Sequence, residues 1–350
     1  MTIRPDFTLS AETNLPGLNF EAMKLVMLHE AQEHDLPVTE NTDTKLCLET
    51  PFGRYTLHDA DAGVRVEVSA AKQDWLFMLK EGLVEHLIHF VPDVVDTLKW
   101  SDADQAGGLP PNFHFATVQS VRPVGTSFLR VRVKARGLSS FQDDAIHFRI
   151  VLPLHSNEDV EWPFVSENGS TVWPKGDKAL HRPVYTTRWI DHAQGLMDFD
   201  VYTHEGGRVT EWARRVDPGS QVAVVGPGGG GIPQTNRILI FADETALPAA
   251  ARILEALPED SQGQVTVQTE SGAHCAYSLS APSGLSITWL DRDAGPALAE
   301  RALIAMAEYP DHFLWFACEK AEVQRVREAF KQKNGDTANA YIAAYWSAQT

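Results

Sequence analysis

From residue 236 onward the chain alternates between short apolar runs and amphipathic stretches, which is the pattern of a doubly wound α/β domain. The predicted strands are 237–242, 264–268, 285–290 and 313–317, and the predicted helices are 247–257, 296–309 and 320–331. Ligands of such sheets bind at the carboxyl ends of the strands, so we expect a ligand beside the residues after 242 and 317. The aromatic tail Tyr341–Trp346 could fold back over a flat ligand.

The residues before this domain are rich in β-forming side chains. The predicted strands are 115–118, 128–133, 147–152, 184–190, 197–202 and 221–225. Six strands at this spacing favour a small closed antiparallel barrel, interrupted by a polar excursion at 153–179.

One barrel segment, 181–189 (HRPVYTTRW), places two arginines around an aromatic ring. A flat ring suits stacking on a flat ligand, and a guanidinium binds phosphate through two hydrogen bonds. Taken alone, the same pattern is also compatible with the outer surface of a barrel. The segments that follow favour the ligand site.

A strand at 198–202 leads through the glycine turn 203–207 into a predicted helix at 208–215. Free backbone N–H groups at such a helix start bind anions, although the helix could equally serve only to cap the barrel. The glycine run 226–231 is followed by a strand and not by a helix. It therefore lacks the context of a dinucleotide fingerprint, and we interpret it as a flexible hinge between domains.

The first hundred residues predict a separate α+β domain with helices at 19–29 and 73–90 and a meander between them. Residues 101–112, acidic and then rich in glycine and proline, predict a linker. His29 and His34 are five residues apart and would face different sides of a helix. His86 and His89 could share a face but are more typical of solvated helix positions, so we predict no metal site.

Composition narrows the function further. The formal net charge of −17 argues against a general nucleic-acid-binding protein. The three widely spaced cysteines exclude a typical cysteine-ligated iron–sulfur cluster and fit a reducing compartment. With no apolar run of membrane-spanning length and no apolar leader at the start, we expect a cytoplasmic protein without membrane insertion.

Several of these motifs together resemble the siderophore-interacting proteins, which are flavin-dependent ferric-siderophore reductases related to ferredoxin–NADP reductases. Residues 182–188 are similar to the family's R-x-Y-T-x-R motif, 204–213 to its H-G-x-G-P-A-S-x-W-A segment, and 243–248 (DETALP) to its nucleotide motif. The first hundred residues resemble an uncharacterised domain often fused ahead of such reductases. Arg208 and Ala242 depart from the family's usual Pro and Gly, and the tail lacks the arginine and glycine that often follow Tyr-Trp.

The resemblance implies four parts: an α+β domain of unknown function (1–100), a linker (101–112), an FAD-binding β-barrel (113–232) and a doubly wound NAD(P)H-binding domain (233–350). It implies that Tyr185 stacks on the flavin, that Thr186 bonds near its N5, and that Arg182 and Arg188 hold phosphate. The implied FAD contacts are Arg182, Tyr185, Thr186, Arg188, His204, Gly207, Thr210, Trp212 and Trp346. Those to NADH or NADPH are Asp243, Thr245, Pro248 and Glu319. The basic residues available for a substrate mouth are Lys320, Lys331 and Lys333.

The expected activity is transfer of electrons from NAD(P)H through FAD to a bound ferric siderophore, releasing Fe(II) for iron acquisition. The chemistry then resides on the flavin and no catalytic side chain is expected. Two alternatives stay open: electron transfer to a ferredoxin or flavodoxin, and a binding or regulatory role centred on the N-terminal domain. The end of the second strand, near 268–270, carries no Arg/Lys pair for a 2′-phosphate, which favours NADH without deciding the choice.

Overall fold

The computed structural model describes residues 7–33, 36–91, 98–102, 106–154, 160–167, 169–293, 296–333 and 339–348. The chain forms two compact units: residues 1–114 with 151–182, and residues 115–150 with 183–350. Among the residues described, no helix is long and apolar enough to cross a bilayer. His34 and the side chain of His89, considered above as metal ligands, fall outside the described part, as do linker residues 103–105.

The first unit is built on a five-stranded antiparallel sheet in the order β1-β5-β4-β3-β2. Its strands are β1 (Leu9–Pro16), β2 (Val38–Asn41), β3 (Lys45–Glu49), β4 (Gly53–Ala60) and β5 (Gly63–Ala70). Burial alternates strictly along β5, where Val64, Val66 and Val68 are buried and the residues between them are half-exposed. One face of the sheet therefore faces the core and the other faces solvent.

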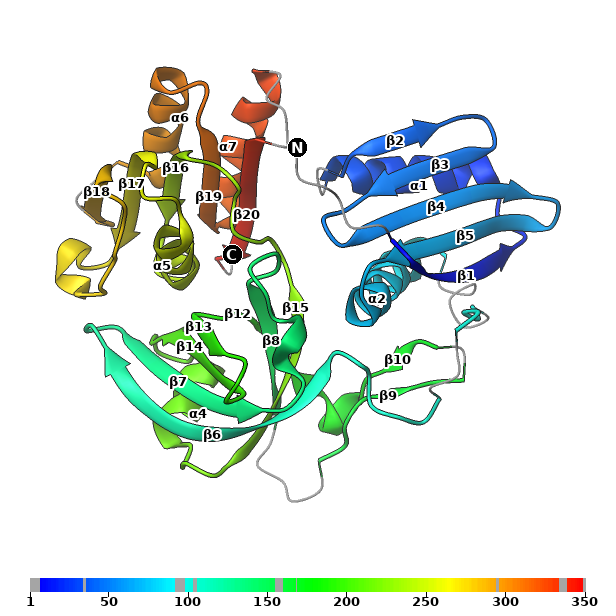
Figure 1. Ribbon diagram of the computed structural model, residues 1–350, viewed down its shortest axis with the longest axis horizontal. Coiled ribbons are helices and arrows are strands. Elements are labelled where there is room, and N and C mark those ends of the chain that lie inside the picture. The colour runs from blue at the N-terminus through cyan, green and yellow to red at the C-terminus, as the bar shows by residue number, and fades with distance from the viewer. Residues whose placement is uncertain are drawn as a thin grey trace. The chain divides into compact units, whose positions relative to one another are not determined.

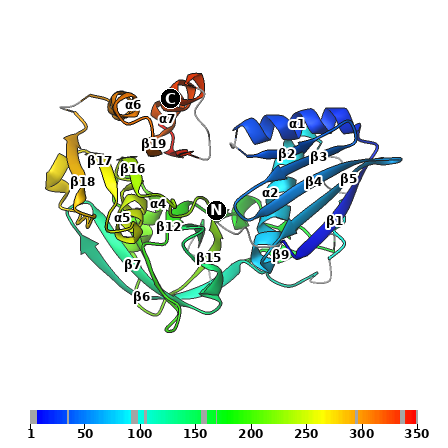
Figure 2. The same ribbon diagram turned by 45° about the horizontal axis from the view of Figure 1, so that its top comes forward.

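Two helices cover the buried face: α1 (Phe20–Glu33) and α2 (Gln73–Phe90) (Figure 2). Tyr55 donates a hydrogen bond from its hydroxyl to the Leu79 carbonyl of α2 (3.0 Å). A Cβ on Gly53 would lie only 2.6 Å from the Leu79 side chain, so α2 packs directly on β4.

Residues 151–182 belong to this first unit and not to the barrel alone. They contain a two-stranded ribbon, β9 (Phe164–Val165) with β10 (Thr171–Val172), and the short strand β11 (Leu180–His181). The Thr171 N–H donates to the Glu81 carboxylate on α2 (3.0 Å), and the Trp162 ring packs on Phe113. The polar excursion predicted at 153–179 is therefore attached to the N-terminal domain.

The second unit begins with a barrel. Its strands are β6 (Phe113–Val124), β7 (Phe128–Ala135), β8 (His147–Pro153), β12 (Val184–Thr186), β13 (Trp189–Asp191), β14 (Leu196–Tyr202) and β15 (Gln221–Gly228). The sheet order is β8-β15-β6-β7-β14-β13, with β12 paired to β8. The helix α4 (Arg208–Arg215) follows β14 and contacts β14 and β7.

The segment from β12 to β13 closes the barrel. Its first half pairs with β8 and its second half with β14, which are the two ends of the open sheet. Between these halves, the Thr187 N–H donates to the Ile146 carbonyl and the Arg188 N–H to the Asp198 carbonyl, both at 2.8 Å. The stretch that carries the R-x-Y-T-x-R pattern is thus the seam of the barrel.

The rest of the second unit, which we call the α/β lobe (residues 233–348), has a five-stranded parallel sheet ordered β18-β17-β16-β19-β20 (Figure 1). Its elements are β16 (Arg237–Ala242), α5 (Leu247–Ala256), β17 (Gln262–Thr269), β18 (Gly284–Asp291), α6 (Leu298–Glu308), β19 (Phe313–Glu319), α7 (Lys320–Gln332) and β20 (Ala340–Trp346).

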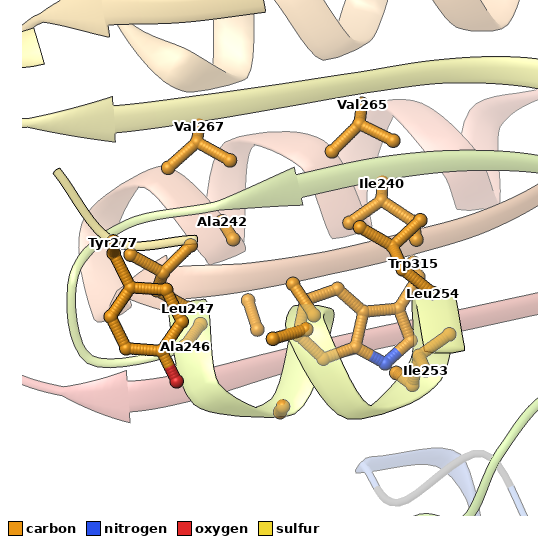
Figure 3. Packing of buried hydrophobic residues seen from close by; sticks show 14 of the residues in the cluster. Ile240, Ala242, Ala246, Leu247, Ile253, Leu254, Val265, Val267, Tyr277 and Trp315 are labelled. Carbon is orange, nitrogen blue, oxygen red and sulfur yellow. The ribbon is translucent and has the colours of Figure 1, made fainter. Parts of the chain in front are cut away.

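Both faces of this sheet are buried. Ile240, Ala242 and Trp315 pack against α5 on one face (Figure 3), whereas Leu239 and Phe241 pack with α6 and α7 on the other. Parallel strands covered on both sides become continuous apolar runs, which is why 237–242 reads RILIFA.

The structure differs from the sequence expectations in several places. The strands β1, β2 (Val38–Asn41) and β20 were not expected; β20 extends the sheet beside β19. The glycine run is not a flexible hinge, because β15 continues through Gly228 and a Cβ on Gly230 would lie 2.5 Å from the Tyr341 ring. Gly231 is equally confined by the carbonyls of Asp143 and Asp144.

Candidate functional site

Tyr185 lies on β12, in the seam of the barrel. Its ring is half-buried and meets the Phe199 ring edge-on at 5.5 Å. Burial raises the pKa of the Tyr185 hydroxyl, so the side chain stays neutral at physiological pH. A ring fixed through its edge, with part of its surface exposed, is suited to stacking on a flat ligand.

The turn between β14 and α4 is the predicted anion site. Gly207 is the N-cap of α4 and makes no side-chain cap hydrogen bond. The start of a helix directs backbone N–H groups outward, which is where helices bind anions. A Cβ on Gly207 would lie 2.7 Å from His204 Nε2 and 2.8 Å from Thr210 Oγ1, so the turn leaves room only for glycine. The buried Thr210 hydroxyl donates to the Tyr202 carbonyl (3.3 Å) and holds the turn in place.

These two features fit two parts of FAD: the exposed part of the Tyr185 ring suits the flavin ring system, and the crowded turn at Gly207 suits the pyrophosphate. Two neighbouring predicted contacts have other partners in the structure. Trp212 stacks on Phe199 at 6.5 Å and packs α4 onto the barrel, and the exposed His204 stacks on Tyr202. Thr186 is buried, with its hydroxyl 3.4 Å from His147 Nδ1.

Arg188 has a different environment from the predicted phosphate contact. Its guanidinium is buried and makes a two-pronged ion pair with Glu255 of α5, with N–O distances of 2.7 and 2.6 Å. Its Nε donates to the Tyr277 hydroxyl (3.3 Å). Because a carboxylate already occupies the edge that a phosphate would need, Arg188 links the barrel seam to the α/β lobe in this structure.

A second arginine strengthens the same link. Arg252, also on α5, donates to the Thr187 carbonyl (2.5 Å) and to the Asp143 carboxylate (3.0 Å). The Tyr277 hydroxyl also donates a short hydrogen bond to Asp200 of β14. Consecutive residues of the seam, Thr187 and Arg188, are thus both bonded to α5.

Arg182 lies at the other end of the motif, in the first unit. Its guanidinium stacks over the Trp173 ring, 3.9 Å from the ring centroid. The residue is half-buried and is positioned by this cation–π contact.

At the carboxyl end of β16, Asp243 organises the start of α5. One carboxylate oxygen accepts from the Thr245 N–H (2.9 Å) and hydroxyl (2.6 Å), and the other accepts from the Trp346 indole N–H (2.6 Å). Burial raises the pKa of Asp243, and the bonds from Thr245 and Trp346 oppose that rise. Pro248, buried in the first turn of α5, has no N–H to satisfy there. Trp346, predicted beside the flavin, thus reaches a residue predicted for the nicotinamide nucleotide.

The same edge of the sheet carries further carboxylates. Glu319 caps α7 by accepting from the Ala321 N–H (2.5 Å), and its second oxygen accepts from the Ala348 N–H (3.2 Å). Glu244 is buried beside Asp243; it pairs with Arg292 and accepts from the Glu270 N–H. The ends of β16, β17 and β19 therefore present acidic groups at the position where doubly wound sheets bind ligands.

The three predicted substrate lysines are not grouped. Lys320 begins α7 at the carboxyl end of β19, whereas Lys331 and Lys333 lie at the far end of this helix. At about 1.5 Å per residue the helix separates them by roughly 16 Å. Of these three lysines, Lys320 lies at the ligand edge of the sheet, and a substrate role for each of them stays a prediction.

His147 was missed by sequence reasoning. It lies on β8 and is 5% exposed, and its Nε2 is 3.0 Å from the Tyr345 hydroxyl of β20. Burial and the charge of Arg252 lower its pKa to about 4, so the ring is neutral at physiological pH. A histidine within an apolar strand gives no periodic signal. Arg252 and Glu255, however, were detectable as charged residues in the otherwise apolar helix LPAAARILEA.

Comparison with known proteins identifies both halves of the second unit. Residues 117–231 match the siderophore-interacting FAD-binding domain, and residues 235–349 match the siderophore-interacting protein domain. The NADPH-dependent ferric-chelate reductase of Escherichia coli is 28% identical over 246 residues, which cover 68% of this chain and 94% of that protein. Ferric vibriobactin reductase of Vibrio cholerae is 29% identical over 192 residues, or 53% of this chain and 67% of that protein.

Solved structures share the fold. The siderophore-interacting protein from Aeromonas hydrophila superposes with a TM-score of 0.58 at 22% identity, covering 69% of this chain and 94% of that one. A siderophore utilization protein from T. fusca gives a TM-score of 0.57 at 24% identity, covering 68% and 94%.

Proposed function

This chain belongs to the siderophore-interacting protein family, and from that premise we propose that it is a flavin-dependent ferric-siderophore reductase. The observation that carries the proposal is the connection between the two halves of the second unit. The barrel seam presents Tyr185, and the next residues, Thr187 and Arg188, are bonded to helix α5 of the α/β lobe. A flavin on the seam would therefore lie beside the strand ends that receive a nicotinamide nucleotide.

We assign the binding roles as follows. Tyr185 supports the flavin ring and Thr186 lies near its N5. Gly207 and the first turn of α4 receive the pyrophosphate through backbone N–H groups. The nicotinamide nucleotide contacts Asp243, Thr245, Pro248 and Glu319. When bound, FAD accepts a hydride from NAD(P)H and passes single electrons to iron.

The substrate is an iron chelate. One hydride carries two electrons, so one NAD(P)H reduces two ferric ions and leaves NAD(P)⁺ and a proton. Siderophores bind iron through hard oxygen donors, which hold Fe(II) more weakly than Fe(III), so reduction releases the metal. Lys320 is the predicted lysine placed to attract an anionic chelate at this edge.

We propose domain boundaries at 100, 112 and 232, supported by the two family matches. We also propose a cytoplasmic location, supported by three buried free cysteines among the described residues. The role of the N-terminal domain stays a separate question.

The test is a steady-state assay of the purified protein with FAD, a ferric siderophore and a colourless Fe(II) trap. NADH and NADPH are compared in parallel. We expect two trapped Fe(II) for each nucleotide oxidised, without any added protein carrier. A requirement for ferredoxin or flavodoxin would overturn the assignment in favour of a protein electron acceptor.

A further inference from the structure

A chain of hydrogen bonds crosses from the α/β lobe to the barrel through His147. Its ring lies between the Tyr345 hydroxyl, 3.0 Å from Nε2, and the Thr186 hydroxyl of the seam, 3.4 Å from Nδ1. The Tyr345 ring also meets the imidazole edge-on at 5.5 Å. Gly229, with φ +71, packs so closely that its Cβ position lies 2.5 Å from the imidazole ring. The imidazole is therefore confined on several sides.

Each ring nitrogen of His147 faces one hydroxyl: Nε2 faces Tyr345 and Nδ1 faces Thr186. A neutral imidazole carries one N–H, so it donates to one of these hydroxyls and accepts from the other. A hydroxyl can take either role, so the same two contacts are made in both tautomers.

We propose that His147 is a positioning residue of the flavin site: its two ring nitrogens hydrogen-bond Tyr345 of β20 and Thr186 of the seam, and this bridge fixes the C-terminal strand β20 relative to the seam residues Tyr185 and Thr186. This inference rests on the proposed reductase function. It assigns to β20 a second task besides completing the sheet. The strand sets the distance between the seam and Asp243, because Trp346, the next residue after Tyr345, is bonded to Asp243.

Two substitutions of His147 test the roles of its two ring nitrogens separately. His147→Gln places its amide near the position of Nε2 and keeps a partner for Tyr345. His147→Asn places its amide near Nδ1, keeps a partner for Thr186 and loses Tyr345. Tyr345→Phe removes the same bond from the other side. His58→Gln, on the solvent-facing side of the N-terminal sheet, is the matched control.

The first measurement needs no flavin. Amide hydrogen exchange of β20 is followed by mass spectrometry, and the imidazole nitrogens are observed by ¹⁵N NMR. We expect the NMR signature of a neutral imidazole at pH 7, and about ten-fold faster exchange of β20 in His147→Asn and Tyr345→Phe. His147→Gln and His58→Gln should exchange like the original protein. A protonated imidazole at pH 7, or equal exchange in the Asn and Gln variants, would overturn the proposal.

The second measurement uses the FAD-loaded protein. We expect kcat with NAD(P)H to fall about ten-fold in His147→Asn and to recover in His147→Gln, with the KM for the ferric chelate unchanged. Combining His147→Asn with Tyr345→Phe should add little to either change alone. Additive effects would contradict the shared bond. Failure of the original protein to bind FAD would refute the reductase function while leaving the exchange and NMR results to decide the role of His147.

Discussion

The two five-stranded sheets of this protein bury their residues in different ways. In the N-terminal sheet, burial alternates along β1 and β5, because helices cover one face of the sheet. In the α/β lobe, adjacent residues such as Leu239 and Ile240 are both buried, because helices cover both faces. A sheet covered on both faces has little room for polar groups except at its ends, so its charged residues gather at the strand ends and at the contact with the barrel.

Shortening two adjacent side chains to alanine should show the difference between the two sheets most strongly, as a loss of stability. Leu239→Ala and Ile240→Ala should each destabilise the α/β lobe by about 2–5 kcal/mol, because each leaves a cavity on a different face. In the N-terminal sheet, Glu67→Ala beside the buried Val66 should change stability by no more than about 0.5 kcal/mol. Denaturant unfolding with hydrogen exchange of the individual strands measures both. An equal loss of unfolding free energy in Leu239→Ala and Glu67→Ala would contradict the comparison.

The pH dependence of stability should distinguish a buried histidine from one on an open face. The pKa of His147 is lowered to about 4 by burial and by Arg252, so the unfolded chain takes up a proton between about pH 6.5 and 4 that the folded chain does not. Stability should therefore fall as the pH decreases through this window, by about 3 kcal/mol in all. His147→Asn should remove this part of the slope.

Urea unfolding at intervals between pH 7 and 4 provides the measurement. His58, half-exposed on the N-terminal sheet, is the comparison: burial and Arg65 also lower its pKa, so His58→Gln should remove part of the slope, but less than His147→Asn does. An unchanged slope in His147→Asn would mean that the ring is protonated in the folded protein.

The ion pair of the α/β lobe should contribute more to the free energy of unfolding than the ion pair of the N-terminal sheet. Arg188→Gln removes a two-pronged bond between a buried guanidinium and the 43% exposed Glu255 carboxylate, and should cost about 1–3 kcal/mol. Arg65→Gln in the N-terminal sheet removes a pair with Glu12 at 3.6 Å, in which both side chains are more than 40% exposed, and should cost less than about 1 kcal/mol. A double-mutant cycle with Glu255→Gln isolates the first pair. Weaker FAD binding in Arg188→Gln without loss of stability would restore the phosphate role for Arg188.

Local patterns in the sequence predicted most of the elements, and the reasons for the exceptions are physical. The helices at 73–90 and 320–331 form where apolar spacing places them. Strand β1 was missed because small and polar residues, including the buried Thr13, obscure its alternation. Strand β20 was missed because it lies at the edge of the sheet, where most of its residues are half-buried or exposed and form no continuous buried run.

The candidate site was predictable to the same extent. The aromatic seam and the glycine turn follow from short motifs whose chemistry is local. The partners of Arg188 and His147 do not, because Glu255 and Tyr345 are 67 and 198 residues away along the chain. Pairs of this kind depend on how the barrel and the α/β lobe pack together, which composition and periodicity do not encode.

The central claim is that the seam and the turn at Gly207 together hold FAD, and a titration of the purified protein with FAD tests it most directly. Quenching of flavin fluorescence should show one FAD per chain. Gly207→Ala should weaken binding about ten-fold, because a Cβ there would crowd the turn that receives the pyrophosphate. A protein that takes up no FAD, or a Gly207→Ala variant that binds it as tightly as the original, would contradict the account.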